Sequence, residues 1–231
     1  MPAMRLWVAL AIGWALAAPA LKADALDALQ RRLAMAAEPR ILFVGNSYSF
    51  KVPGALAQLA QEGRPGAVVE RVTRGGWTLR KHAGSKETLA RIRGGKWDVV
   101  VLQEQSQLPS FSREQRGEQM IPHAKNLVEE IRKAGAVPVF FQTWGRRNGD
   151  LQNAGAFPDD TFAKMQARLI VGYREAAEAA GGVLVVPDGE AWAEEMKAGN
   201  GKRLYARDGS HPSAAGVLHS AGIFYRFFFG E

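Results

Sequence analysis

Four short and almost wholly apolar runs recur along the chain, with helical patterns between them. The runs are residues 41–44, 99–102, 137–141 and 183–186, and residues 68–72 form a fifth, more polar run. Continuous apolar runs of this length are typical of strands buried on both faces. Apolar spacing of three to four residues over 124–131 and 162–180 indicates helices between them. The alternation predicts an α/β protein, a flavodoxin-like three-layer αβα sandwich with a mostly parallel five-stranded sheet.

The N-terminus is expected to be a secretory signal. Arg5 precedes an apolar run over residues 6–17, and residues 18–20 (APA) are small enough for a signal peptidase to read. A membrane anchor is the alternative, but spanning a bilayer takes about twenty apolar residues and this run is shorter. We therefore expect a signal peptide over residues 1–23, cleaved near 20–23, and one domain over residues 24–231. The protein would then be exported, periplasmic or extracellular, with no stable membrane anchor.

Composition excludes several classes of site. The chain has no cysteine, which removes disulfides, thiolate metal sites and cysteine catalysis. The net charge of +7 comes from scattered basic residues with little aromatic interleaving, which argues against nucleic acid as a partner. With four histidines and no acidic cluster at ligand spacing, no metal site is expected.

Two short motifs contain the candidate catalytic residues of the chain. Residues 45–49 (GNSYS) directly follow the first apolar run, and residues 208–213 (DGSHPS) lie near the C-terminus. A serine hydroxyl becomes a nucleophile when an imidazole removes its proton and a carboxylate orients that imidazole. Ser47, His211 and Asp208 can supply these three groups, and the spacing of the last two places both on one side of a tight turn.

Candidate site residues follow the other predicted strands as well. Gly75 and Gly76 follow the second strand, Gln105 the third and Trp144 the fourth. Since ligands bind at the carboxyl ends of parallel strands, these residues should share one edge with the two motifs. Either motif alone is also typical of a capped turn, but their convergence on one edge favours catalysis.

In these motifs the chain resembles the SGNH hydrolases, also called GDSL-like esterases and lipases, over about residues 40–228. Residues 45–49 match their serine block, residues 208–213 their histidine block and residues 76–78 their glycine block, with Gly75 as a competing assignment. The third block departs from the family, because residues 102–106 read LQEQS where the family usually has glycine, any residue and asparagine. Alignment by the strand puts Gln105 in the asparagine position, with Gln103 as the competitor.

The resemblance implies a serine esterase that needs no cofactor. Ser47 would attack an ester carbonyl, with His211 and Asp208 as base and orienting acid. The backbone N–H groups of Ser47 and Gly76, together with the Gln105 side-chain amide, would hold the oxyanion.

The substrate is expected to be a small-molecule or glycan ester. Two polar loops, residues 106–117 and 145–158, flank the predicted site. They favour a short acyl group, such as acetyl on a carbohydrate. Trp77 and Trp144 are candidate substrate-binding platforms for sugar rings, or else packed walls of the site. The alternative function is a catalytically weak carbohydrate-binding or assembly protein on the same scaffold.

Overall fold

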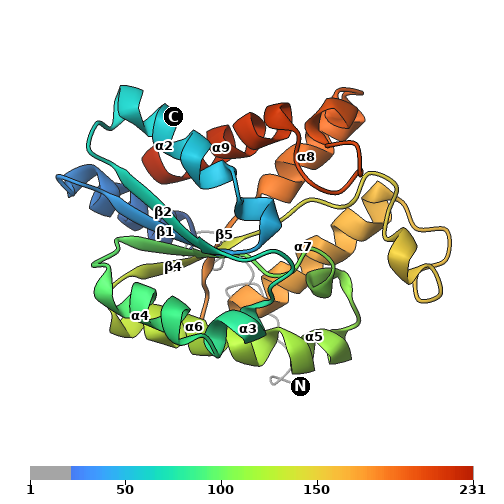
Figure 1. Ribbon diagram of the computed structural model, residues 1–231, viewed down its shortest axis with the longest axis horizontal. Coiled ribbons are helices and arrows are strands. Elements are labelled where there is room, and N and C mark those ends of the chain that lie inside the picture. Colours follow the sequence, from blue (N-terminus) through green and yellow to red (C-terminus); the bar gives the residue numbers. More distant parts are fainter. Residues whose placement is uncertain (1–21, 231) are drawn as a thin grey trace, which may run out of the picture.

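The computed structural model describes residues 22–230, and Figure 1 shows their arrangement. The predicted signal peptide over residues 1–23 lies outside the described residues, apart from its last two positions. No helix within residues 22–230 is both long enough and apolar enough to cross a bilayer.

A five-stranded sheet forms the middle layer, and all its pairings are parallel. Its strands, in sheet order, are β2 (Val68–Thr73), β1 (Arg40–Gly45), β3 (Val99–Leu102), β4 (Val137–Phe141) and β5 (Leu184–Val186). Each strand falls within or close to one of the five predicted runs. This 2-1-3-4-5 order is the flavodoxin-like order, so the predicted fold class is confirmed.

Helices cover both faces of this sheet (Figure 1). One layer contains a helix over residues 22–35, α2 (Val52–Gly63), α8 (Asp188–Lys197) and α9 (Ala214–Phe229). The other contains α3 (Leu79–Ala83), α4 (Lys86–Gly94), α6 (Ile121–Lys133) and most of α7 (Phe162–Ala179), with α5 (Arg113–Gln119) packed on α6. The periodic patterns over 124–131 and 162–180 therefore lie in helices, as predicted.

Two apolar cores result, one on each face of the sheet. Ile41 and Phe43 of β1 enter the core beneath α2 and α9, whereas Leu42 and Val44 enter the core beneath α3 and α6. Because side chains alternate along a strand, burial on both faces requires an unbroken apolar run. The polar residues that follow each strand are consequently gathered at the carboxyl edge of the sheet.

Candidate active site

Three side chains from the two sequence motifs lie in one hydrogen-bonded line. His211 Nδ1 lies 2.6 Å from Asp208 Oδ2, and His211 Nε2 lies 2.9 Å from the Ser47 hydroxyl oxygen. Because an ionised carboxylate only accepts hydrogen bonds, Nδ1 carries the ring proton and Nε2 accepts from the Ser47 hydroxyl. The fold brings together the serine, histidine and aspartate that the motifs pointed to.

The histidine loop, residues 208–211, orients its own carboxylate. Asp208 Oδ1 accepts hydrogen bonds from the N–H groups of Ser210 and His211, at 2.9 and 3.0 Å. Partial burial works to raise the pKa of Asp208, but hydrogen bonds from the His211 ring and from these two N–H groups outweigh it and lower the pKa. Asp208 is therefore a carboxylate at neutral pH.

The nucleophile turn, residues 45–49, is held from the neighbouring strand by Gln103. Gln103 Oε1 accepts from the Asn46 N–H at 2.9 Å and from the Ser49 hydroxyl at 3.0 Å, while Gln103 Nε2 donates to Asn46 Oδ1 at 3.0 Å. A Cβ atom on Gly45 would lie 2.6 Å from Gln103 Oε1, so a larger residue there would displace the Gln103 side chain. Gln103 thus supports the turn that presents Ser47.

His82 supports the same turn from behind. Its side chain is fully buried, its Nε2–H donates to the Gly45 carbonyl at 2.9 Å, and the Thr88 hydroxyl donates to its Nδ1 at 3.0 Å. Burial lowers the pKa of His82, so the ring is neutral at pH 7, which matches this pattern of one donor and one acceptor.

The glycine block lies against the nucleophile turn. Asn46 Nδ2 donates to the Trp77 carbonyl at 3.0 Å, which ties the two loops together. Gly76 has φ of 68°, in the left-handed region that favours glycine, whereas Gly75 does not. Within residues 22–230 the Gly76 N–H donates to no backbone acceptor. Ser47 opens the short 3-10 turn η1 (Ser47–Ser49), where its N–H has no partner within the turn.

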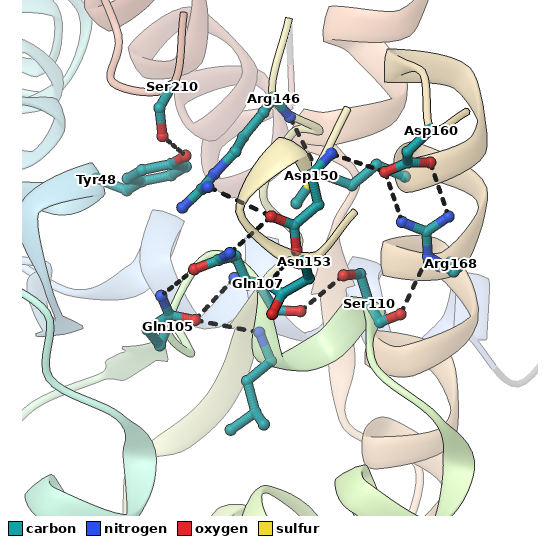
Figure 2. Close-up of polar contacts among 12 residues, drawn as sticks. Tyr48, Gln105, Gln107, Ser110, Arg146, Asp150, Asn153, Asp160, Arg168 and Ser210 are labelled. Atoms are coloured by element: carbon teal, nitrogen blue, oxygen red, sulfur yellow. Dashed lines mark hydrogen bonds and ion pairs between the residues drawn. The ribbon is translucent and has the colours of Figure 1, made fainter. Parts of the chain in front are cut away.

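The Gln105 side chain is engaged in its own loop. Its Oε1 accepts from the N–H groups of Gln107 and Leu108, at 2.8 and 3.1 Å, and its Nε2 donates to Gln107 Oε1 at 3.2 Å. Figure 2 shows this amide turned toward Gln107. The role of Gln105 as an oxyanion donor stays a prediction, and it would require one amide N–H to turn toward the substrate.

Sequence reasoning missed Glu104, a fully buried carboxyl that joins two loops of the site. Its Oε1 accepts from the Leu79 N–H at 3.0 Å and from the Gln105 N–H at 2.6 Å. Burial raises the pKa of Glu104 to about 8 in spite of these hydrogen bonds. The available signal was a charged residue two positions after a wholly apolar strand.

Trp144 is a wall of the site, so the prediction that it binds substrate is wrong. Its ring is fully buried and stacks between Tyr48, at 4.8 Å, and Trp192, at 4.0 Å. Its Nε1–H donates to the Ser210 carbonyl at 3.0 Å, which anchors the histidine loop. A sugar ring could reach this indole only by displacing one of the stacked rings.

Trp77 remains accessible, because its side chain is only partly buried. Its ring packs edge-on against His82 at 5.0 Å, and the Arg74 guanidinium lies 5.8 Å from it. Trp77 also lines a hollow at the carboxyl edge of the sheet together with Thr78. The proposal that it stacks on a sugar is compatible with this position.

Comparison with known proteins supports the family resemblance. No protein-family model and no curated protein matches the chain in sequence. Among solved structures, a proposed SGNH hydrolase from Slackia heliotrinireducens is similar at 29% identity and a TM-score of 0.67, over 82% of this chain and 98% of that one. A DUF4886 family protein from Bacteroides uniformis is similar at 20% identity and a TM-score of 0.69, over 84% of each chain.

A third similar structure is the acetylxylan esterase Axe2 of Geobacillus stearothermophilus. It is 19% identical, with a TM-score of 0.63, over 84% of this chain and 95% of that one. The order of the parallel sheet and the similarity over nearly the whole length of these structures agree with the motifs. This chain therefore has the α/β fold of the SGNH hydrolases, the family that its sequence resembles.

Proposed function

We propose that this protein is a serine esterase that hydrolyses carboxylic esters of short acyl groups. The observation that carries the proposal is the hydrogen-bonded line from Ser47 through His211 to Asp208, with contacts of 2.9 and 2.6 Å. A serine hydroxyl aligned with an imidazole, itself fixed by a carboxylate, is the arrangement that nucleophilic acyl transfer requires.

In the proposed mechanism, Ser47 Oγ attacks the ester carbonyl while its proton passes to His211 Nε2. Asp208 stabilises the resulting imidazolium. Collapse of the tetrahedral intermediate breaks the bond to the alcohol, which leaves with the proton from His211. Water, deprotonated by His211, then attacks the acyl-enzyme and releases the acid.

Backbone N–H groups are the best-supported oxyanion donors. Those of Ser47 and Gly76 stand on two loops that are joined through Asn46, and the left-handed φ of Gly76 fixes the course of its loop. Losing one such donor typically costs about 3 kcal/mol in the barrier. Gln105 would add a third donor if its amide turned away from Gln107.

Two observations favour a short acyl group on a carbohydrate. The hollow beside His211 is lined largely by polar side chains such as Asn148 and Gln152, and a structurally similar protein is named an acetylxylan esterase. We propose acetyl as the acyl group. We also propose export, on the basis of the apolar run over residues 6–17.

A series of p-nitrophenyl esters of increasing acyl length tests the proposal. The wild-type protein should hydrolyse acetate fastest, and Ser47→Ala should lose at least about 10⁴-fold in kcat because it lacks the nucleophile. Ser213→Ala is a matched control, because within residues 22–230 the hydroxyl of this serine is hydrogen-bonded to the Arg203 carbonyl and to the Gly216 N–H, at the start of α9, and not to His211. An active and correctly folded Ser47→Ala protein would exclude the mechanism.

One observation favours a second candidate, a carbohydrate-binding or assembly protein with weak chemistry. Gln105 stands in the position of the family's asparagine, and its side-chain amide is hydrogen-bonded to Gln107 in its own loop. Retained glycan binding without hydrolysis that depends on Ser47 would support this candidate over the esterase.

A further inference from the structure

Three hollows adjoin along the carboxyl edge of the sheet, and together they offer more volume than a small ester needs. Their volumes are about 660, 340 and 310 Å³. The first and second share Thr78, Leu108 and Gln119 as walls, and the second and third share Gln152. We call this series the rim groove. It runs from Trp77, past Gln105, to His211.

The rim groove is built to contact hydroxyl groups. Side-chain amides line its middle and its far end: Gln105, Gln107, Asn148, Gln152 and Asn153. The amides of Gln105, Gln107 and Asn153 are already hydrogen-bonded within the site, whereas those of Asn148 and Gln152 have no side-chain partner among residues 22–230. Such amides both donate and accept hydrogen bonds, as sugar hydroxyls do. With the partly exposed Trp77 ring at the other end, the lining fits a chain of sugars better than an apolar acyl chain.

One end of the rim groove is basic. Arg80 and Lys81 line the hollow beside Trp77, and both are exposed. Neither forms an ion pair with any residue of the described range 22–230, whereas the nearby Arg74 is paired with Glu87 at 2.6 Å. Two positive charges are therefore left for a ligand in this hollow.

Arg146 places a third positive charge at the other end, beside His211. Its side chain is 15% exposed, and its nearest acidic contact is a loose one of 3.4 Å to Asp150 Oδ1. Asp150 is already held by Gln107 Nε2 at 2.7 Å and Asn153 Nδ2 at 2.8 Å, while Nε of Arg146 is buried without a hydrogen-bond partner. Figure 2 shows the guanidinium between Tyr48 and Asp150.

Apart from Asp150, which contacts Arg146 from behind the groove, little negative charge opposes these cations. Among the described residues that line the rim groove, Asp208 is the one carboxylate, and it already accepts from the His211 ring and from two N–H groups. A guanidinium with free N–H groups binds carboxylates in a planar, two-pronged geometry, and lysine adds a point charge.

We infer that the substrate is an acidic sugar chain, in which ester groups are carried by units that bear carboxylates. The inference rests on the proposed esterase function and assigns its substrate class. The ester lies at Ser47, carboxylates of units on one side bind Arg80 and Lys81, and a carboxylate on the other side binds Arg146. A neutral acetylated glycan offers these cations no partner.

Two polymers that differ only in charge test the inference. The probes are O-acetylated polygalacturonate and the same polymer with its carboxylates methyl-esterified, and the readout is the initial rate of acetate release. At low salt kcat/KM should be about tenfold higher for the carboxylate form, and the preference should shrink as salt screens the attraction. The double variant Arg80→Gln/Lys81→Gln and the single variant Arg146→Gln should each lower the preference at least about threefold.

Arg31→Gln is the matched control. Arg31 is exposed on the helix over residues 22–35, and its neighbour Arg32 contacts Asp98 at the amino end of β3, away from the rim groove. This variant should keep the full preference. The double variant changes only exposed side chains, so it remains informative even if Arg146→Gln does not fold.

The measurements distinguish an error in the substrate class from an error in the proposed esterase function. Hydrolysis of p-nitrophenyl acetate with equal rates on both polymers, or a preference that survives in all variants, would overturn the acidic substrate and leave the esterase standing. If no ester is hydrolysed, the inference is tested by binding instead. Affinity electrophoresis compares the binding of unacetylated polygalacturonate with that of its methyl-esterified form. Preferential binding of the carboxylate form would uphold the acidic ligand, and equal or absent binding would refute it.

Discussion

The two halves of the candidate site are held in place in different ways. The nucleophile turn is fixed by buried side chains from distant parts of the chain, Gln103 and His82. The histidine loop orients its acid and base through hydrogen bonds among its own residues, and the side chains of Asp208 and His211 are 50% and 43% exposed. The serine therefore depends on buried side chains behind it, whereas Asp208 and His211 are oriented within a local turn that Trp144 anchors to the fold.

Because of this difference, substitutions in the two halves should affect stability and activity differently. Substitutions behind the nucleophile turn should lower both, because they leave buried polar groups without partners. Substitutions in the histidine loop should lower activity with little effect on stability, because water can replace the lost contacts.

Of the substitutions that test this contrast, Asp208→Asn should have the largest effect. An amide at this position no longer fixes the proton on Nδ1 of His211, so kcat should fall by about 10³-fold or more. The free energy of unfolding should change by less than about 1 kcal/mol, since the side chain is half exposed. Steady-state kinetics and urea unfolding measure the two quantities, and loss of the fold would remove the contrast between the two halves.

Gln103→Leu should affect both quantities. It leaves the Asn46 N–H and the Ser49 hydroxyl without their acceptor, so the free energy of unfolding should fall by about 2–4 kcal/mol. Because the turn would no longer hold Ser47 in place, kcat should also fall by about tenfold or more. Gln61→Leu, on the exposed surface of α2, is the control and should be close to neutral. A stable, fully active Gln103→Leu protein would contradict the account.

The pH dependence of stability should report on Glu104, the buried carboxyl of the site. Its pKa is raised from 4.5 to about 8 by burial, so between these values the folded protein holds a proton that the unfolded chain has lost. The free energy of unfolding should thus fall as pH rises from about 4.5 to 8. Glu104→Gln should flatten the slope, but only in part, since burial also raises the pKa of Asp188, to about 7.

Thermal unfolding at several pH values measures this slope. Glu129→Gln, which removes an exposed carboxyl from α6, should leave it unchanged. An identical slope in the wild type and Glu104→Gln would show that the Glu104 carboxyl is ionised in the folded protein.

The smallest effects on stability and kcat are expected from substitutions of Gly75 and Gly76. Gly76→Ala should cost about 1 kcal/mol of stability, because alanine disfavours φ of 68°, and should lower kcat if its N–H holds the oxyanion. Gly75→Ala should be nearly neutral, because its added methyl group would meet only the Phe50 ring, at 3.9 Å. The reverse order in kinetics and unfolding would favour Gly75 as the donor.

Much of the fold, and the proximity of Ser47, His211 and Asp208, could be predicted from the sequence. Burial on both faces forces unbroken apolar strands such as 99–102, and parallel order then gathers the residues that follow them. Ser47, His211 and Asp208 could be found because their chemistry demands these residue types in short motifs.

The remaining side chains could not be placed in this way. Gln105 has several possible partners, and the choice between the substrate and its own loop depends on Gln107, whose position is set by Asp150. Burial of Trp144 depends on Tyr48 and Trp192, which lie far away in the sequence. These are tertiary contacts, and periodicity carries no information about them.

The most direct test of the central claim is labelling with a fluorophosphonate, which reacts with activated serines. The label is located by peptide mass spectrometry in the wild type, Ser47→Ala and His211→Ala. One label per chain is expected, on Ser47, and it should be absent from Ser47→Ala and strongly reduced in His211→Ala. Labelling of another serine, or none in a folded wild-type protein, would contradict this expectation.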